Sequence, residues 1–155
     1  MKLADIIAVD AVAIATDVNS KKRALEELSH LLARQCPECA SRDIFAALIS
    51  REKLGSTGLG SGVGIPHGRI EGLTRSVGAV LKLPTAIDFE SIDRQGVDLL
   101  FGLIVPKDAG NEHLHLLAGI AALCQDDTAV AALRACDDPA ELHALIADQH
   151  VGSSS

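Results

Sequence analysis

The fold of this chain is decided by two apolar stretches of sequence, Val77-Gly-Ala-Val-Leu-Lys-Leu83 and Val97-Asp-Leu-Leu-Phe-Gly-Leu-Ile-Val105. In each stretch the apolar residues follow one another almost without a break, so neither shows the period of three to four residues that marks an amphipathic helix. A short continuous apolar run is typical of a strand that is buried on both faces of a sheet. The two runs therefore predict a central sheet whose two faces are both covered.

The segments on either side of these runs predict helices and one further strand. The residues at 21–34 place Leu25, Leu28 and Leu31 at helical spacing, and Asp138 followed by Pro139 is a typical helix start. Residues 112–124 are apolar almost all round, which predicts a buried helix. Further helices are expected at 3–7, 43–54 and 126–135, and a buried strand at 11–15. Helices that alternate with buried strands predict an α/β single-domain sandwich, with a mixed, mostly parallel β-sheet flanked by helices on both faces.

Length and composition limit the classes of function. The 155 residues fit one domain, which we expect to span 1–151, with a disordered tail at 152–155. The net charge of −7 disfavours binding to nucleic acid or to anionic lipid, and an aromatic content of 2% provides no stacking platform for bases. The sequence holds neither a targeting segment nor an apolar stretch of membrane-spanning length. We therefore expect a cytoplasmic protein without membrane insertion.

The four cysteines do not form the pattern of a disulfide framework in a chain of this length. Cys36 and Cys39 make a Cys-x-x-Cys motif, which can serve redox chemistry or metal binding. A thioredoxin-like motif lies between a strand and a helix, whereas this motif follows a predicted helix. The motif therefore predicts a turn between two helices with two reduced thiols, and a redox sensor is the alternative.

A glycine-rich segment separates the second predicted helix from the first long apolar run. Seven of the 13 glycines lie between Gly55 and Gly72, and Ser56 and Thr57 add hydroxyl groups. Such density indicates unusual backbone conformations or a close approach of the backbone to another group, and this composition suits phosphate recognition. The segment has no Gly-Lys-Ser/Thr ending and no G-x-G-x-x-G spacing, so it matches neither nucleotide-binding loop. A flexible turn is the alternative.

His67 is the candidate nucleophile of this segment. Pro66 stiffens the chain before it, and Gly68 is expected to let the chain turn away after it. A neutral imidazole can accept and pass on a phosphoryl group, and Arg51 and Arg69 are the cations nearest in sequence. An ordinary surface histidine is the alternative.

Two further histidines lie at the start of the predicted helix 112–124. His113 and His115 are two residues apart, about 200° around a helix, so they cannot face one site. His113 lies in the first turn, where backbone N–H groups favour an anion, whereas His115 shares a face with small residues and is expected to pack closely. None of the six histidines forms a His-x-x-x-His pair, so we expect no metal site.

The sequence from Arg51 to Arg69 resembles a known active-site signature. It reads Arg-Glu-Lys-Leu-Gly-Ser-Thr-Gly-Leu-Gly-Ser-Gly-Val-Gly-Ile-Pro-His-Gly-Arg and is similar to that of the enzyme IIA domains of the bacterial phosphoenolpyruvate-dependent phosphotransferase system (PTS), mannitol/fructose class. In this resemblance His67 matches the phosphorylated histidine, His113 the auxiliary histidine, and Arg51 an arginine near the active centre. The resemblance covers essentially the whole chain and implies the mannitol-type IIA fold.

The resemblance also implies a mechanism. A phosphocarrier protein of the HPr or NPr type would present a phosphohistidine, and Nε2 of His67 would attack it without metal, nucleotide or other cofactor. His113 and Arg51 would then hold the equatorial oxygens of the phosphoryl group. The further phosphate-binding residues expected in this arrangement are Ser56, Thr57, Gly68 and Arg69.

Within the family, the chain most resembles the nitrogen-regulatory branch. We expect a freestanding protein, and its motifs read Gly-Ile-Pro-His-Gly-Arg and His-Leu-His-Leu-Leu. This branch implies that phosphorylation sets which regulatory partners are bound, such as potassium-transport or sensor-kinase systems, by a monomer or weak dimer. Two alternatives are a sugar-specific IIA protein that passes phosphate to a IIB component and a non-catalytic interaction module.

Overall fold

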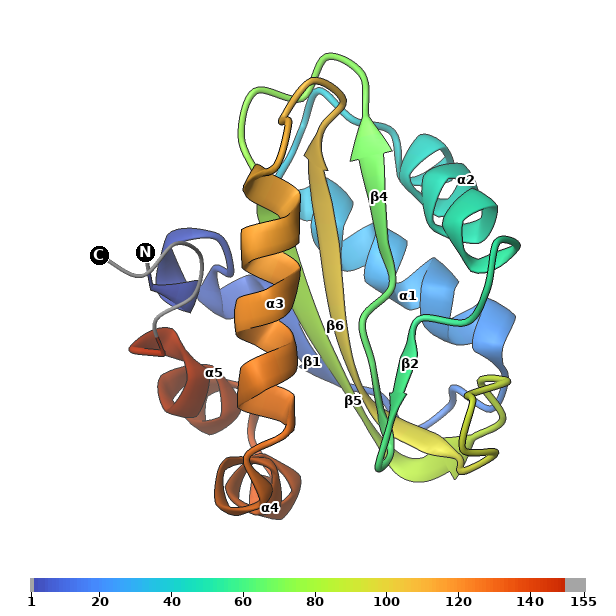
Figure 1. The fold of residues 1–155 in the computed structure, drawn as a ribbon. Coiled ribbons are helices and arrows are strands. Elements are labelled where there is room, and N and C mark those ends of the chain that lie inside the picture. Colours follow the sequence, from blue (N-terminus) through green and yellow to red (C-terminus); the bar gives the residue numbers. More distant parts are fainter. Residues whose placement is uncertain (1, 150–155) are drawn as a thin grey trace.

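The computed structural model describes residues 2–149, and within them the two apolar runs form the centre of a six-stranded sheet (Figure 1). The expected tail at 152–155 lies outside the described residues. The strand order is β1-β5-β6-β3-β2, and β4 also pairs with β6. The strands are β1 (Val12–Ile14), β2 (Gly58–Gly60), β3 (Val63–Gly64), β4 (His67–Ile70), β5 (Val77–Ile87) and β6 (Val97–Pro106).

The sheet is mixed, as predicted. Its longest pairing, between β5 and β6, is antiparallel and sets Val80 opposite Phe101. The pairings β1–β5, β3–β6 and β4–β6 are parallel, and β2–β3 is antiparallel. Both long strands run a little further than predicted, because β5 continues to Ile87 and β6 to Pro106.

Helices cover both faces of the sheet. The helices are α1 (Lys21–Arg34), α2 (Ser41–Glu52), α3 (Glu112–Cys124), α4 (Asp127–Ala135) and α5 (Pro139–Ala147), and two 3-10 turns, η1 (Leu3–Asp5) and η2 (Val9–Ala11), precede β1. In Figure 1, α1 lies behind the sheet, α2 lies beside β4 and α3 lies in front of the sheet. Side-chain caps begin α1 at Ser20, α4 at Asp126 and α5 at Asp138. The second helix begins and ends two residues earlier than predicted.

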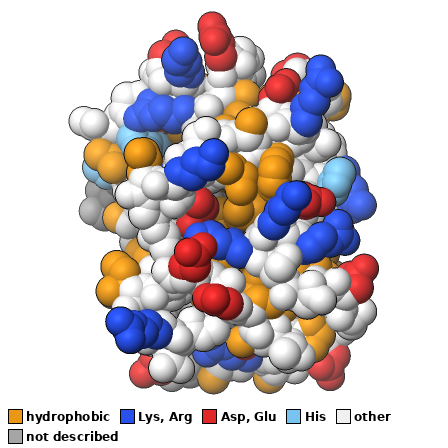
Figure 2. Space-filling view, turned by 90° about the vertical axis from the view of Figure 1, so that its right-hand side faces the viewer, with side chains coloured by type: hydrophobic (Ala, Val, Ile, Leu, Met, Phe, Trp, Pro, Cys, Tyr) orange, Lys and Arg blue, Asp and Glu red, His pale blue; other side chains and the backbone are white. Residues whose placement is uncertain are grey.

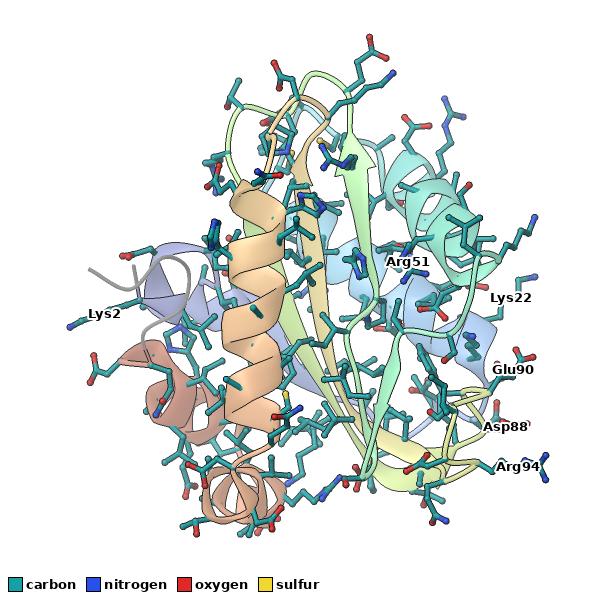
Figure 3. All side chains as sticks on the ribbon, in the orientation of Figure 1. Lys2, Lys22, Arg51, Asp88, Glu90 and Arg94 are labelled. Atoms are coloured by element: carbon teal, nitrogen blue, oxygen red, sulfur yellow. The ribbon has the colours of Figure 1, made fainter. Side chains whose placement is uncertain are left out.

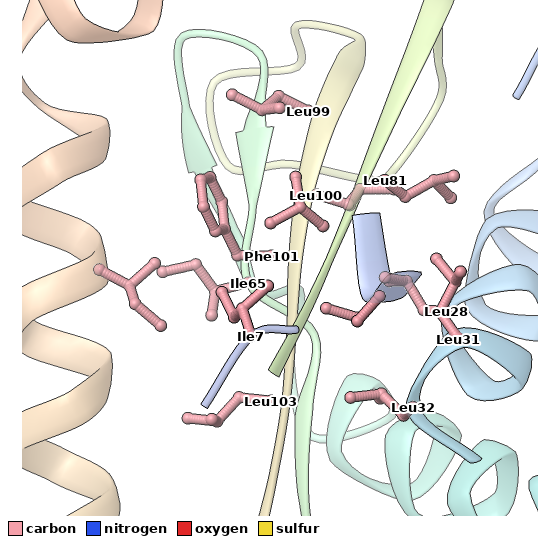
Figure 4. Packing of buried hydrophobic residues seen from close by; sticks show 14 of the residues in the cluster. Ile7, Leu28, Leu31, Leu32, Ile65, Leu81, Leu99, Leu100, Phe101 and Leu103 are labelled. Carbon is pink, nitrogen blue, oxygen red and sulfur yellow. The ribbon is translucent and has the colours of Figure 1, made fainter. Parts of the chain in front are cut away.

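The core occupies both sides of the two long strands (Figure 4). Leu28 and Leu32 of α1 are fully buried on one side, and both would contact a Cβ atom at Gly102 of β6. Phe101 and Leu103 of β6 lie on the side of α3, where they are also fully buried. Successive side chains of β6 point to opposite faces of the sheet, so one set packs against the layer of α1 and the other against the layer of α3.

One prediction about the chain's organisation is wrong, and the glycine-rich segment is more regular than the flexible turn that was its alternative interpretation. The helix α3 is buried on one side only: Leu116 and Ile120 face the core, whereas Leu114 is 54% exposed. Several residues of this helix are alanines. They make its composition apolar, but their small side chains do not have to be buried. The glycine-rich segment is not simply a loop, because it contains β2, β3 and β4. Its tight turn at Ser61 (φ 57°) and Gly62 (φ 85°) joins β2 to β3, and left-handed backbone at both positions suits a two-residue hairpin.

The charges and the helix lengths bear on possible partners. On the face that Figure 2 shows, Lys and Arg side chains alternate with Asp and Glu instead of gathering into one basic patch. Between residues 2 and 149, no single helix has the length and hydropathy to cross a membrane. The pair α3 and α4 meets both criteria only when taken together, and it is bent by 79°.

Candidate functional site

A pocket of about 490 Å³ lies where α2, β4, β6 and the first turn of α3 meet. Its walls combine apolar side chains from the helices and strands with two histidines and two arginines. The lining residues are Ala47, Ser50, Arg51, Leu54, His67, Gly68, Arg69, Leu103, Val105 and His113. The structure thus brings together five of the seven site residues expected from the sequence.

His67 is the first residue of β4, where it lies opposite Leu103 of β6. Its Nδ1 lies 2.8 Å from the carbonyl oxygen of Ile65. Because a carbonyl oxygen only accepts hydrogen bonds, Nδ1 carries the hydrogen and donates it. In the neutral ring, Nε2 therefore carries the lone pair. The backbone two residues upstream thus fixes both the tautomer and the orientation of the imidazole.

The surroundings of His67 favour its neutral form. Burial lowers the pKa of His67 below its ordinary value of 6.5, and the positive charge of Arg51 acts in the same direction. The carbonyl of Ile65 and the carboxylate of Glu52 act in the opposite direction but do not outweigh the burial. A neutral ring with its lone pair at Nε2 is the form of histidine that attacks phosphorus.

Gly68 follows His67, but it does not turn the chain as the sequence suggested, since β4 continues through it to Ile70. The glycine instead allows a close approach between β4 and α2. A Cβ atom at this position would lie 3.0 Å from Cβ of Ala47 and 3.2 Å from the Ala47 carbonyl carbon. The missing side chain therefore lets α2 pack directly against the strand that carries His67.

Arg51 lies in the last turn of α2 and extends toward β4 (Figure 3). Its Nη1 donates a hydrogen bond to the carbonyl oxygen of Gly55, at 2.9 Å. This bond ties the side chain to the start of the glycine-rich segment and leaves other guanidinium N–H groups for a ligand, because arginine has five. The close packing of α2 on Gly68 is what brings this cation into the pocket beside His67.

Arg69 and His113 form the opposite wall. Arg69 donates to the carbonyl oxygens of Lys107 (2.8 Å) and Gly110 (3.2 Å), which lie just before α3. Nδ1 of His113 lies 2.9 Å from the same Gly110 oxygen, and Nη2 of Arg69 lies 2.9 Å from Nδ1 and 3.2 Å from Nε2 of the same ring. Arg69 therefore connects β4 to the first turn of α3.

Ser56 and Thr57 do not line the pocket. The hydroxyl of Ser56 donates to the carbonyl oxygen of Phe89 at 3.0 Å and accepts from the backbone N–H of Gly58 at 3.1 Å. Thr57 is buried, and both its backbone N–H and its hydroxyl donate to the carboxylate of Glu52. Their hydroxyl groups therefore hold the glycine-rich segment in place instead of facing the pocket.

Glu52 is a structural residue that the sequence reasoning missed. The residue is only 9% exposed. In addition to accepting the bonds from Thr57, its Oε2 forms an ion pair with Nζ of Lys21, at 2.8 Å. A carboxylate directly after Arg51, at the end of a helix and before a glycine-rich segment, was the available signal. Its role is to join the start of α1, the end of α2 and the segment that leads to His67.

Two other expectations concern metal binding and His115. Across the described part of the chain, no group of three or more His, Cys, Asp or Glu side chains lies close enough to hold a metal ion. His115 was expected to pack closely, but it is exposed on the outer side of α3. The prediction was wrong because the small residues beside it also face outward.

Comparisons with known proteins identify the family of this chain. Residues 5–149 match the family model described as "Phosphoenolpyruvate-dependent sugar phosphotransferase system, EIIA 2". The chain therefore belongs to the type-2 enzyme IIA family of the phosphotransferase system.

Within that family, relatives of several organisms at 42–44% identity are named nitrogen regulatory protein. The nitrogen regulatory protein of Klebsiella oxytoca is 42% identical over 149 residues, which cover 96% of this chain and 91% of the relative. The crystal structure of nitrogen regulatory protein IIA-Ntr from Neisseria meningitidis superposes with a TM-score of 0.86 at 36% identity, covering 93% of this chain and 98% of that one. IIA mannitol from Escherichia coli shares the fold, with a TM-score of 0.75 at 18% identity over 90% and 98% of the two chains.

Proposed function

We propose that this chain is a phosphohistidine relay protein in which His67 accepts a phosphoryl group from a phosphocarrier protein of the HPr or NPr type. The observation that supports this most directly is the bond from Nδ1 of His67 to the Ile65 carbonyl oxygen, at 2.8 Å. This bond leaves the lone pair of the neutral ring on Nε2, in a pocket that also holds Arg51, Arg69 and His113. A nucleophile beside three groups that can bind phosphoryl oxygens is what phosphoryl transfer requires.

In the proposed step, Nε2 of His67 forms a bond to phosphorus while the phosphorus–nitrogen bond to the carrier's histidine breaks. The electron pair of the broken bond stays on the carrier's imidazole. Charge on the three equatorial oxygens is then held by Arg51 from α2, by Arg69 from β4 and by His113 from α3. The donor is already a phosphoramidate, so the step consumes no nucleotide.

The site residues differ in how directly they take part in this proposal. Gly68 contributes by the close approach of α2, which brings Arg51 to the pocket. Ser56 and Thr57 contribute through the shape of the glycine-rich segment, because their hydroxyl groups bond to Phe89 and Glu52. They are therefore assigned to support of the loop instead of phosphate contact.

The proposed output is regulatory. Relatives at 42% identity are named nitrogen regulatory protein, and their lengths match that of this chain closely. A phosphoryl group adds close to two negative charges at one spot, which is enough to change which partners dock there. We propose that the phosphorylation state of His67 selects among regulatory partners, with potassium-transport and sensor-kinase systems as the first to examine.

The test is intact-mass spectrometry after incubation of the protein with phosphoenolpyruvate, enzyme I and a phosphocarrier protein. The expected result is a gain of one phosphoryl group that is lost in acid and is absent in His67→Ala. His115→Ala is the matched control, because His115 is exposed on the far side of α3 and should leave labelling unchanged. Labelling of His67→Ala, or no labelling of the native chain with any carrier, would overturn the proposal. Rapid onward transfer to a sugar-specific IIB protein would replace the regulatory output with a transport one.

A further inference from the structure

The turn between α1 and α2 holds two sulfur atoms side by side. The backbone N–H of Cys39 donates to the carbonyl oxygen of Cys36 at 2.9 Å, and this tight turn brings the two Sγ atoms to 2.6 Å from each other. Both cysteines carry free thiols. A disulfide bond is about 2.05 Å long, so the two sulfurs can join with only a small movement of the turn.

The two thiols differ in accessibility. Cys36 is fully buried, whereas Cys39 is half-buried. Burial raises the pKa of the Cys36 thiol to about 12, and its hydrogen bond to Cys39 acts in the same direction. Cys36 is therefore protonated and shielded, and Cys39 is the sulfur that a reagent from solution can reach.

Cys39 opens into a groove of about 280 Å³. Acidic side chains line much of this groove, and two of its residues, Ala47 and Arg69, also line the pocket of His67. Cys39 also stands next to Ala40, the N-cap residue of α2, which is the helix that carries Arg51. The dithiol thus lies at the start of the helix that forms one wall of the proposed phosphoryl site.

We propose that Cys36 and Cys39 form a reversible dithiol–disulfide site whose oxidant is a low-molecular-weight disulfide such as oxidised glutathione. The thiolate of Cys39 attacks one sulfur of the oxidant, the disulfide of the oxidant breaks, and one thiolate leaves. Cys36 then gives its proton to that leaving thiolate and attacks Sγ of Cys39, which expels the second thiolate; this takes up from solvent the proton that Cys39 released when it ionised. In total, the two protein thiols lose two hydrogen atoms and the oxidant becomes two thiols.

The other two cysteines provide an internal comparison. Cys124 and Cys136 are both buried, near the C-terminal ends of α3 and α4, and the thiol of Cys136 donates to the carbonyl oxygen of Ala132 at 3.4 Å. Burial raises the pKa of Cys124 to about 12. Neither thiol has the exposed partner that the first step needs, so both should stay reduced under the same conditions.

The proposal is tested on the full chain, treated with oxidised glutathione at neutral pH and then alkylated under denaturing conditions. Intact mass should show a loss of two hydrogen atoms and only two alkylated cysteines. Trypsin cleaves after Arg34 and Arg42, so the oxidised pair should appear within the single peptide 35–42. Dithiothreitol should then restore four alkylated cysteines.

Single substitutions assign the order of the two steps. Cys36→Ser should hold one glutathione on Cys39, because the resolving thiol is missing, and Cys39→Ser should react hardly at all. Alkylation of all four cysteines in the treated native chain would overturn the proposal, as would a glutathione adduct on Cys39 that persists while Cys36 is present. The native peptide map decides the outcome even if a substituted chain fails to fold, and it does not depend on phosphorylation of His67.

Discussion

The two histidines of the pocket differ in the contacts that hold them. His67 lies in a strand, is half-buried, and bonds to a backbone carbonyl two residues away. His113 lies in the first turn of a helix and shares its contacts with the long side chain of Arg69 and with Gly110. Both rings lie beside a backbone carbonyl oxygen close in the sequence, but only His113 also contacts a charged side chain, that of Arg69, which lies 44 residues earlier.

Under the proposed function, this difference corresponds to a division of tasks. A nucleophile must keep one tautomer and one direction, which a local backbone bond provides. A residue that stabilises charge on the transferred phosphoryl group must adjust its position as that group arrives. The contact between the side chains of His113 and Arg69 allows such a movement.

The first prediction removes each ring in turn. His67→Ala should lose phosphoryl acceptance completely, because the bond-forming atom is gone. His113→Ala should accept the group more slowly by roughly 10²–10³-fold, which is the usual cost of losing one donor to a transition-state oxygen. Stopped-flow or quenched-flow labelling measures both rates, with His115→Ala as the matched control. A faster rate for His67→Ala than for His113→Ala would reverse the two roles.

The second prediction separates the two walls by removing Arg69. Arg69→Ala deletes a cation and also the side chain that orders His113, so the labelling rate should fall by about 10- to 100-fold, which corresponds to about 1.5–3 kcal/mol for a charge-assisted hydrogen bond. Arg94→Ala is the control, because Arg94 is exposed and lies in the loop between β5 and β6 at the far end of the sheet (Figure 3). Equal rates for the two variants would show that Arg69 has no part in transfer.

The third prediction concerns the contact that positions α2. Gly68→Ala places a methyl group 3.0 Å from Cβ of Ala47, so the free energy of unfolding should fall by about 1–3 kcal/mol, as is typical of overpacking. Urea unfolding measures the change. In a double-mutant cycle, Ala47→Gly should recover part of the loss, because it removes the atom that the new methyl group meets. Strict additivity of the two changes would mean that this contact does not limit the approach of α2.

The fourth prediction uses the titration of His67. Because burial lowers its pKa, the ring should stay neutral below pH 6.5, and its NMR titration midpoint should lie under that value. The unfolded chain binds the proton more readily, so the contribution of His67 to stability is present above about pH 6.5 and is lost as the pH falls through the folded pKa. Arg51→Ala should raise the midpoint slightly. A midpoint at or above 6.5 in the native chain would contradict the effect of burial.

The sequence predicted the parts of this molecule that depend on local pattern. The apolar runs at 77–83 and 97–105 became β5 and β6, because a strand buried on both faces needs such a run. The motifs around His67 and His113 were sufficient to predict that the two histidines share one site, and the structure places both residues in one pocket. The pairing of β5 with β6 as antiparallel neighbours had no such local signal, since it depends on how the whole chain folds.

The differences between the sequence expectations and the structure share a physical cause. Ser56 and Thr57 were expected to face a phosphate, yet their hydroxyl groups bond to Phe89 and Glu52, which lie up to 33 residues away in the sequence. Gly68 was interpreted as a turn because its reason for being glycine, the contact with Ala47, is a tertiary one. Sequence spacing shows which residue types are near along the chain, but side-chain direction is decided by neighbours from other elements.

The three contacts of Arg69 also bear on the entropy of ligand binding. A flexible side chain normally loses about 0.5–1.5 kcal/mol of freedom when a ligand immobilises it. Arg69 is already held by the carbonyl oxygens of Lys107 and Gly110 and by His113 before any phosphoryl group arrives. The bonds to the two carbonyl oxygens use two of its five N–H groups, so others remain to receive an anion while these two bonds stay intact. The ordering cost of this arginine is therefore met during folding, and an incoming phosphoryl group meets a cation that is already in place.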